Sequence, residues 1–497
     1  MRTELARFPI TTLFFLLFLP QTIFSQQQLG MRLERYAGIY SAGINPSNTA
    51  FTPHNWEVSL FNADLFVENS YAFLRNTSLQ NALRNTDKIV SLADTSAENP
   101  PPSDAIFQDF ADESGRKMHF VTQTRVAGPA FSFRFGEKNV VGLTTAFRSH
   151  ISAYQIPQIL AYRTIADLPR NQAINIPAVG LSGMTWGEIG LHYSRLEEIG
   201  DLQMAWGVSP KILMGYEGFY TRAQSNFDYT QRFDDTVAFG SAQWDYALTT
   251  ANLTDDAEQV KLRRQGAGFG LDLGISWAMP ADDPEDGYAW RAGVSLLDAG
   301  FVRFKRTAQR HHIEFDTLLT VSNADFPQRD EAEAVLGDIS QAFLGDPQAS
   351  LQKRAFAIGL PTALSAQFDA RLVPMLYVGG VLIQRVPLSK YAVKRPSTLA
   401  IVPRFEHRWA SVSLPLVVDD WRSFRAGVAI RLAWLYLGTD NLGSFTSKEK
   451  LSGADVYIGF KINAFSFKKR EKGFRGKRES GSRSNGPNRR KIKCYTF

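Results

Sequence analysis

The chain has 497 residues, a formal net charge of +6, and contents of 44% hydrophobic and 12% aromatic residues. Its single cysteine, Cys494, lies close to the C-terminus, so a disulfide framework and a cysteine-rich metal site are excluded. Length alone would allow two or three globular domains, but a large barrel can also reach this size as one unit.

Residues 1–25 have the pattern of a secretory signal peptide. Arg2 and Arg7 precede the apolar run 13–19, which is followed by Pro20 and by Ser25. The run is shorter than the roughly 20 residues that a membrane-spanning helix needs. We therefore expect an exported protein, and no later window of the sequence is apolar enough to predict a transmembrane helix.

Alternating apolar residues predict strands throughout residues 56–467. In segment 266–277, one face carries Ala267, Phe269, Leu271, Leu273, Ile275 and Trp277, while the other carries glycine, serine and Asp272. Segments 128–135, 188–194, 364–372, 427–436 and 454–464 alternate in the same way. A period of two is typical of strands that have one apolar face.

Two features favour a membrane barrel over a soluble sandwich. The strands reach about 10 residues or more, which is the length that a tilted strand needs to cross the hydrocarbon layer. Aromatic residues lie near the ends of the apolar faces, as in interfacial girdles: Tyr193, Trp277, Trp290, Trp434 and Tyr436. Because backbone groups in lipid must all be paired, the sheet should close.

We therefore predict an all-β protein, a transmembrane antiparallel β-barrel of roughly 14 strands over residues 56–467. A short plug-like segment at residues 26–55 and helical loop insertions complete the prediction. The expected location is the cell outer membrane of a Gram-negative bacterium, in contact with outer-membrane lipids.

Three local irregularities are expected within this barrel. The alternation breaks around Asn62–Ala63, where we predict a β-bulge. Residues 78–93 have a weakly helical pattern, and residues 330–344 resemble an amphipathic helix that begins with a capping box formed by Asp330 and Glu333. We expect both helical segments to be ordered extracellular loops, with a lumenal plug as the alternative.

Residues 468–497 contain twelve Lys or Arg and two Glu, a composition typical of a disordered basic tail. Its expected partner is a periplasmic or other anionic surface, and the alternative is a solvated extension without contacts. Export argues against nucleic acid as a partner.

Catalytic motifs are not found in the sequence. The seven histidines form no zinc-binding motif, no Gly-x-Ser-x-Gly elbow occurs, and the only cysteine belongs to the tail. We predict that the protein is not an enzyme and that it needs no cofactor or metal.

Charged residues on the polar strand faces are predicted to point into the lumen. An Arg or Lys side chain that faces lipid at the bilayer midplane costs about 2–4 kcal/mol, so the opposite orientation is favoured. We expect these residues to form a salt-bridge network that fills the lumen, with a translocation site as the alternative. They are Arg134, Asp272, Asp369, Arg371, Arg385, Arg431, Asp455 and Lys461.

Several short motifs resemble those of known outer-membrane barrels. The run Gly43-Ile44-Asn45-Pro46-Ser47-Asn48 resembles the Asn-Pro-Ala segment of long-chain fatty-acid transporter (FadL-type) barrels, although Ser47 stands where those transporters have alanine. Their Bacteroidota relatives include the barrel subunit of the type IX secretion system. The runs 268–274, 438–443 and 453–461 are similar to strands of a Bacteroidota barrel family of unknown function. The resemblance implies that Asn45 and Pro46 lie near or inside the periplasmic mouth.

Two functions remain open from the sequence. The first is passage of small hydrophobic molecules across the outer membrane. The alternative is a non-transporting structural or scaffold barrel associated with a secretion or envelope-assembly machine. A continuous apolar cavity would favour passage, whereas a lumen packed with paired charges would favour the scaffold.

Overall fold

The computed structural model describes residues 28–91, 104–110, 118–157, 169–234, 236–250, 263–283, 287–327, 329, 332–446 and 450–465. The predicted signal peptide and basic tail lie outside the described residues, as does Asp330 of the predicted capping box. No helix in the described part of the chain is long and apolar enough to cross a membrane.

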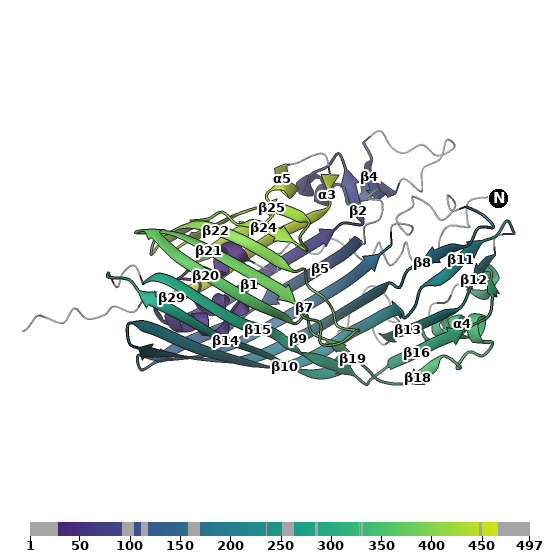
Figure 1. Cartoon of the computed structure of the whole chain (residues 1–497), viewed down its shortest axis with the longest axis horizontal. Helices are drawn as coiled ribbons and strands as arrows, with labels where there is room; N and C mark the ends of the chain where they lie inside the picture. Colours follow the sequence, from purple (N-terminus) through teal and green to yellow (C-terminus); the bar gives the residue numbers. More distant parts are fainter. Residues whose placement is uncertain are drawn as a thin grey trace, which may run out of the picture. The chain divides into compact units, whose positions relative to one another are not determined.

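The strands form a closed antiparallel barrel of 14 strands, which confirms the predicted fold class (Figure 1). The last strand pairs with the first from Trp56↔Ala464 to Glu68↔Gly453, so the sheet has no free edge. Three positions are occupied by two shorter strands in succession, and a fourth begins with the short strand β19. In chain order the strands are β1 (His54–Asn69), β5 (Met118–Ala127) with β6 (Ala130–Phe135), β7 (Asn139–Ile156), β9 (Gly180–Ile199), β10 (Leu202–Ala223), β14 (Gly266–Pro280), β15 (Tyr288–Phe304), β19 (Phe356–Gly359) with β20 (Ala363–Val373), β21 (Leu376–Arg385), β22 (Thr398–Glu406), β23 (Ala410–Ser413) with β24 (Leu416–Asp419), β25 (Ser423–Ala426) with β26 (Val428–Leu432), β27 (Leu435–Thr439) and β29 (Gly453–Phe465).

The outer surface of the barrel is apolar and the inner surface is polar, as the alternation predicted. On β14, Phe269, Leu273 and Trp277 are exposed, whereas Asp272 and Ser276 between them are buried. The same alternation of exposed apolar and buried polar residues continues on β20. An apolar belt around a polar interior is the arrangement of a transmembrane barrel.

One predicted strand is in fact a hairpin. Residues 427–436 do not run straight: β26 ends at Leu432, and the turn Ala433–Trp434 leads into β27. The outward-facing residues have even numbers before the turn and odd numbers after it, because Leu432 pairs with Leu435 and both face outward. Tyr436 therefore lies in the lumen, 2% exposed, and the prediction that it belongs to the outer aromatic girdle is wrong.

The bulge in β1 lies earlier than predicted. The register against β29 shifts between Ser59 and Phe61, not at Asn62–Ala63. Leu60 and Phe61 both point outward at the shift. The inward-facing residues therefore have odd numbers before it and even numbers after it. The apparent break at Asn62 in the sequence is the consequence of this earlier shift.

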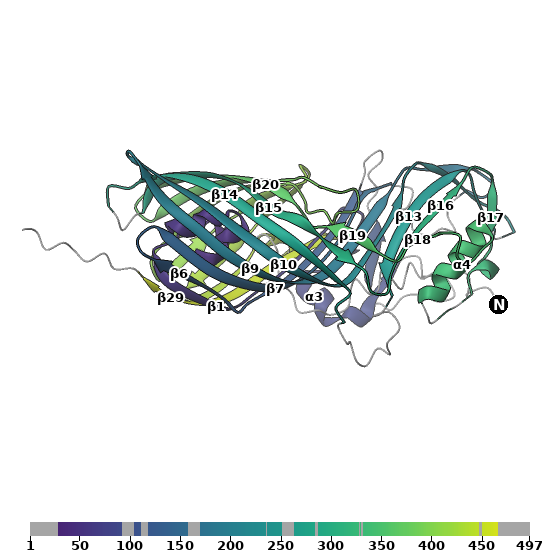
Figure 2. The same cartoon turned by 90° about the horizontal axis from the view of Figure 1, so that it is seen from below.

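The two ends of the barrel differ in the length of their connections. At one end, here called the short-turn end, strands are joined by residues 136–138, 200–201, 374–375, 407–409 and 433–434. Apart from the turn at residues 420–422, the connections at the other end, the loop end, are longer, and several form additional structure beyond the barrel wall (Figures 1 and 2). Outer-membrane barrels have short periplasmic turns and longer extracellular loops, which fits this asymmetry.

The loop end carries two small sheets, a hairpin-like extension and short helices. The sheets contain β2 (Ala72–Arg75), β3 (Ile89–Ser91), β4 (Ile106–Phe110) and β28 (Lys450–Leu451), and β8 (Ile174–Ile176), β11 (Phe227–Gln231), β12 (Val237–Phe239) and β17 (Leu319–Val321). The extension contains β13 (Ala242–Thr249), β16 (Ala308–Phe315) and β18 (Leu351–Lys353). The helices are α3 (Leu79–Arg84), η3 (Thr86–Lys88), η7 (Asn323–Asp325), α4 (Ala332–Leu344) and α5 (Gly443–Thr446). Helix α4 confirms the helix predicted at residues 330–344, and α3 is shorter than the predicted segment.

The N-terminal residues fill the barrel near its short-turn end. They form α2 (Leu29–Arg32), η1 (Gly38–Gly43) and η2 (Pro46–Phe51), which are the purple helices enclosed by the wall in Figures 1 and 2. Residues 28–53, here called the plug, are almost entirely buried and lead directly into β1.

Candidate functional site

The plug is bonded to the barrel wall all around its circumference. Its backbone carbonyl at Ile44 accepts hydrogen bonds from Ser295 Oγ at 2.6 Å and from Gln367 Nε2 at 3.1 Å. On another side, Thr49 Oγ1 lies 2.6 Å from Ser194 Oγ. Further bonds reach side chains of β1, β6, β14, β22, β23, β26, β27 and β29.

Asn45 is the centre of the contacts between the plug and the wall. Its side chain is fully buried, and Nδ2 donates to Gln367 Oε1 at 2.9 Å and to Ser276 Oγ at 3.1 Å. Its Oδ1 accepts from the backbone N–H of Ser47 at 3.0 Å and so caps η2, whose first residue is Pro46. The structure therefore places Asn45 and Pro46 inside the lumen, bound to the wall.

Glycines in the wall allow this close approach. A Cβ atom at Gly274 would overlap Asn45 Oδ1 and lie 3.0 Å from Pro46 Cδ, and one at Gly207 would lie 2.5 Å from the Pro46 carbonyl carbon. We expect the substitution Gly274→Ala to displace Asn45 and to destabilise the plug by about 1–3 kcal/mol, as overpacking does elsewhere.

Limited trypsin digestion at Arg32 and Arg35 of the plug measures this effect. The matched control is Gly380→Ala on β21, where the nearest atom to the new Cβ is Phe368 O at 3.9 Å. Faster cleavage of the plug in Gly274→Ala alone is the expected result. Equal cleavage in both variants would contradict the close contact between Asn45 and β14.

Two of the predicted lumenal charges that bind the plug are buried. Arg431 Nε lies 2.8 Å from Glu34 Oε2, and Lys461 Nζ lies 2.7 Å from Glu57 Oε2. Lys461 also donates to the carbonyl oxygens of residues 36 and 37 of the plug, at 3.0 and 2.7 Å. These charges hold the plug against the wall.

Two other predicted carboxylates belong to buried networks of the wall. Asp272 lies 2.7 Å from Lys211 Nζ, which also contacts Asp298 at 2.8 Å; Arg148 bonds Asp298 at 2.9 Å. This cluster fills the lumen between the plug and the loop end. Asp369 forms a second cluster with four side chains of neighbouring strands: Tyr288, Arg291, Arg404 and, through Arg404, Glu406.

The remaining four predicted residues lie at the edges of the lumen or in its wall. Arg134 donates to the carbonyl oxygens of plug residues 50 and 52, both at 2.9 Å. Arg385 pairs with Asp420 at 2.6 Å, and Asp455 accepts from the backbone N–H of residue 440 at 2.7 Å. Arg371 is half-buried near the end of β20. All eight predicted residues thus lie on the lumenal side of their strands, although they belong to several separate clusters.

The partners of these charges were not predicted from the sequence. The available signal was the polar face of each alternating segment, because the partners in the wall lie on such faces. Which charge pairs with which partner, however, depends on contacts across the barrel. The partners are Glu34, Glu57, Arg148, Glu188, Lys211, Arg291, Asp298, Arg404, Glu406 and Asp420.

A second insertion closes the barrel nearer the loop end. Residues 386–397, here called the inner loop, connect β21 to β22 and turn into the lumen. The backbone N–H of Val393 donates to Gly359 O at 3.1 Å, and that of Lys394 donates to Ser152 Oγ at 2.8 Å. Ala392, Val393 and Arg395 of this loop are buried.

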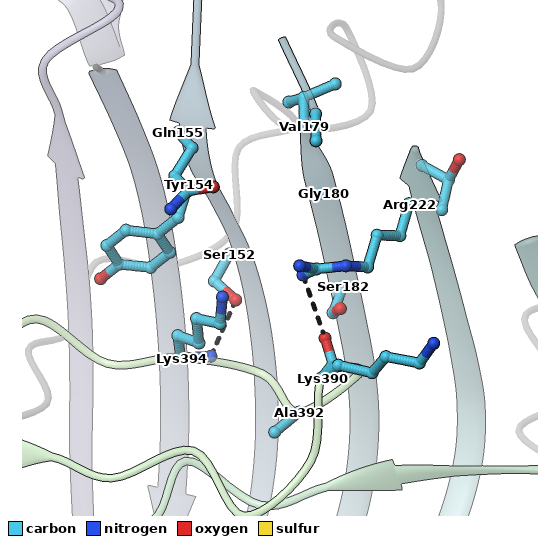
Figure 3. Close-up of a pocket in the computed structure, with 12 residues that line it drawn as sticks. Ser152, Tyr154, Gln155, Val179, Gly180, Ser182, Arg222, Lys390, Ala392 and Lys394 are labelled. Carbon is cyan, nitrogen blue, oxygen red and sulfur yellow. Dashed lines mark hydrogen bonds between the residues drawn. The ribbon is translucent and has the colours of Figure 1, made fainter. Parts of the chain in front are cut away.

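A small pocket lies between the inner loop and the wall. Figure 3 shows Arg222 of β10 and Lys390 and Lys394 of the inner loop around it, with Ser152 and Ser182 beside them. A second recess of about 770 Å³ lies over the outward apolar side chains of β10, β14, β15, β20 and β21. Trp206, Leu273 and Leu364 contribute to this outer recess.

The fold and the filled lumen define the class of the protein: a plugged, transmembrane-type antiparallel β-barrel. Residues 50–440 match a family described as a family of unknown function, DUF5723, and the chain belongs to this family. No curated protein sequence matches the chain.

Three solved structures share part of the course of this chain. The Ralstonia pickettii toluene transporter TbuX is 10% identical, covers 89% of this chain and 99% of its own, and has a TM-score of 0.39. The monoaromatic hydrocarbon channel TodX, as a deltaS2 mutant, is 7% identical with coverages of 86% and 95% and a TM-score of 0.40. A Pseudomonas aeruginosa FadL homologue is 6% identical, with coverages of 88% and 97% and a TM-score of 0.23. Similarity at this level carries no information about a substrate.

Proposed function

We propose that this chain is a closed, non-conducting barrel of the bacterial outer membrane, a structural or scaffold protein without enzymatic activity. The observation that supports the proposal is the filled lumen, which contains the plug at one level and the inner loop at another. Between them lies the buried cluster of Arg148, Lys211, Asp272 and Asp298. Paired buried charges are a poor lining for the passage of a hydrophobic molecule, because an apolar group that separates them would leave buried charges without partners, which is costly.

The loop end offers the surface that a scaffold needs. The small sheets, the extension and α4 project beyond the membrane-spanning part of the wall in Figures 1 and 2. The rigid barrel below them would hold this region at the cell surface, where a secretion or envelope-assembly machine is the proposed partner.

One observation favours the second candidate function, passage of small hydrophobic molecules. The outer recess of about 770 Å³ is lined by apolar side chains and lies on the wall to which the plug is bound. Asn45 and Pro46 contact Gly207 and Gly274 of the same wall from the inside. Passage would require the plug to leave these glycines.

A disulfide that locks the plug distinguishes the two functions. Thr49 and Ser194 have their hydroxyl oxygens 2.6 Å apart, so the pair Thr49→Cys/Ser194→Cys is placed to form a bond in a chain that also carries Cys494→Ser. Uptake of a radiolabelled aromatic hydrocarbon or fatty acid by whole cells is measured with the protein oxidised and reduced.

A closed scaffold is expected to give the same uptake as cells without the protein in both states. The reduced protein is the matched control for the oxidised one, since the sequence is identical. Uptake above that background in the reduced state, and its loss on oxidation, would overturn the scaffold proposal in favour of passage.

A further inference from the structure

The outer recess is a groove that crosses five neighbouring strands of the wall. These strands are β10, β14, β15, β20 and β21, and Figure 2 shows the first four side by side. Two rows of outward side chains form the sides of the groove, and within each row every residue pairs with the next across the strands. The first row runs from Trp206 on β10 to Leu382 on β21, and the second runs from Val208 to Gln384. The groove therefore lies perpendicular to the strands.

The floor of the groove is closed backbone. Between the two rows lie Gly207, Gly274, Ser295 and Ser365, which pair with one another across the strands. Their side chains, where they have any, face the lumen: Ser295 Oγ donates to the plug at Ile44 O, and Ser365 is 1% exposed. A molecule in the groove thus stays outside the wall, and one layer of backbone separates it from the plug.

The groove slopes from the loop end into the middle of the lipid belt. Gln384 precedes Arg385, the last residue of β21, and Arg385 pairs with Asp420 in the turn at the loop end. Trp206 lies in the part of β10 nearer the short-turn end. Four strand spacings give a length of about 19 Å. With strands tilted by about 35–45°, the groove descends about 11–13 Å, close to half of a hydrocarbon layer of about 25–30 Å.

These dimensions select one kind of apolar occupant. Outward residues of one strand are two positions apart, so the two rows stand about 7 Å from each other. An α-helix with its side chains is about 10–12 Å wide and does not enter such a groove, and neither does the convex wall of a second barrel. The volume of about 770 Å³ is more than twenty times the share of one water molecule, about 30 Å³, so a chain of methylene groups fits. An acyl chain of the surrounding lipid has the required width and depth.

The upper end of the groove carries an amide on an otherwise apolar face. Gln384 is exposed, and its Nε2 donates to the carbonyl oxygen of Arg385 at 3.3 Å. Within the described part of the chain, Oε1 of Gln384 accepts no hydrogen bond. A polar group beside hydrocarbon is stabilised by a polar partner. The ester region of an outer-leaflet lipid lies at this depth and offers such a partner.

We propose that the outer recess binds one acyl chain of an esterified lipid of the outer leaflet, with the ester group at Gln384 and the tail toward Trp206. Because hydrocarbon also surrounds an empty groove, the preference comes from close packing and from the amide hydrogen bond, and not from the hydrophobic effect. The bound chain covers the thin, glycine-containing part of the wall behind which Asn45 and Pro46 lie. This binding site goes beyond the scaffold function and does not depend on it.

Photocrosslinking of the full mature chain in phosphatidylcholine vesicles tests the proposal. The probe is a trace of phosphatidylcholine with a diazirine in one acyl chain, and mass spectrometry locates the labelled residues. Labelling is expected to concentrate on the groove. Ala366→Phe places a ring in the first row and should reduce it, whereas Ala370→Phe, on the outer face of the same strand but outside the groove, is the matched control and should not. Gln384→Leu should reduce labelling about threefold, the effect of one hydrogen bond in a membrane.

Heat-dependent migration on a detergent gel verifies that each variant is folded. Equal labelling of the groove in Ala366→Phe and Ala370→Phe, or labelling spread evenly around the outer face, would overturn the site. Labelling of plug residues 44–48 would show that the lipid passes through the wall and would contradict the closed floor. A free fatty acid with the same diazirine should label the groove less than the ester does. Stronger labelling by the free acid would overturn the assignment to a membrane lipid.

Discussion

Replacement of Leu273 by arginine is expected to destabilise the folded barrel by about 2–4 kcal/mol. Leu273 lies at the midpoint of β14 (Gly266–Pro280), and its side chain is 41% exposed on the outer face. An arginine there would place its charge in the middle of the hydrocarbon layer, far from either interface. Urea unfolding of the protein in lipid vesicles, followed by tryptophan fluorescence, measures the loss.

The depth of the position provides the control. Leu432 is also exposed on the outer face, but it ends β26 beside the turn at residues 433–434. Leu432→Arg should therefore cost about 0–1 kcal/mol, because its guanidinium reaches the interface. An equal loss in both variants would mean that β14 does not cross a membrane at this level, and would remove the assignment of the outer face to lipid.

The outward faces were predictable because lipid and lumen impose opposite requirements on alternate residues. On β14 the apolar residues Phe269, Leu273 and Trp277 fix the outer face, and a shift by one residue would place Asp272 in lipid. The sequence therefore contains enough information to set the face of each long strand. The closure into a barrel followed from the need to pair every backbone group.

The short strands near the turns were less predictable for a physical reason. The hairpin formed by β26 and β27 has Ala433 and Trp434 in its turn, with neither glycine nor asparagine to mark it, although Ala433 adopts a φ of +52°. In the sequence, Trp434 and Tyr436 continue the alternation of Ile430 and Leu432. The alternation therefore gives no sign that the outward face moves from even to odd residue numbers at the turn.

The pairing of the lumenal charges could not be predicted at all. Lys461 and Glu57 lie on polar strand faces, but 404 residues separate them in the chain. They meet because β29 and β1 close the barrel and because the register there places Ser59 opposite Lys461. Contacts of this kind are decided by the register across the seam, and no local pattern in the sequence specifies it.

The plug illustrates the complementary case. Asn45 and Pro46 were expected near the mouth only because their motif resembles that of a known barrel family. The structure explains the motif physically: Asn45 caps η2, and both residues fit against the glycines at positions 207 and 274. The glycines themselves are recognisable in the sequence as small residues on the lumenal face, but their contact with the plug is not.

The substitution Lys461→Met is expected to destabilise the protein by about 3–5 kcal/mol, since it removes one partner of a buried ion pair. Lys461 and Glu57 are each at most 1% exposed, and the remaining contacts of Glu57 are Ser132 Oγ at 2.7 Å and the backbone N–H of Ile39. The change would leave a buried carboxylate at the seam between β1 and β29. It would also remove the donor from two plug carbonyls, so the plug and the seam should weaken together.

A double-mutant cycle separates the ion pair from the loss of packing. The double variant Glu57→Gln/Lys461→Met should regain part of the stability lost in Lys461→Met, because no unpaired charge remains. Arg195→Met is the control, since the pair of Arg195 with Glu197 is partly exposed and should contribute about 0–1 kcal/mol. Unfolding in urea of the unchanged protein, Lys461→Met, Glu57→Gln and the double variant gives the four free energies of the cycle. If Lys461→Met lost no more than Arg195→Met, the seam would be hydrated and the plug would not depend on it. A large loss that the double variant partly restores would show instead that one buried pair joins the first strand, the last strand and the plug.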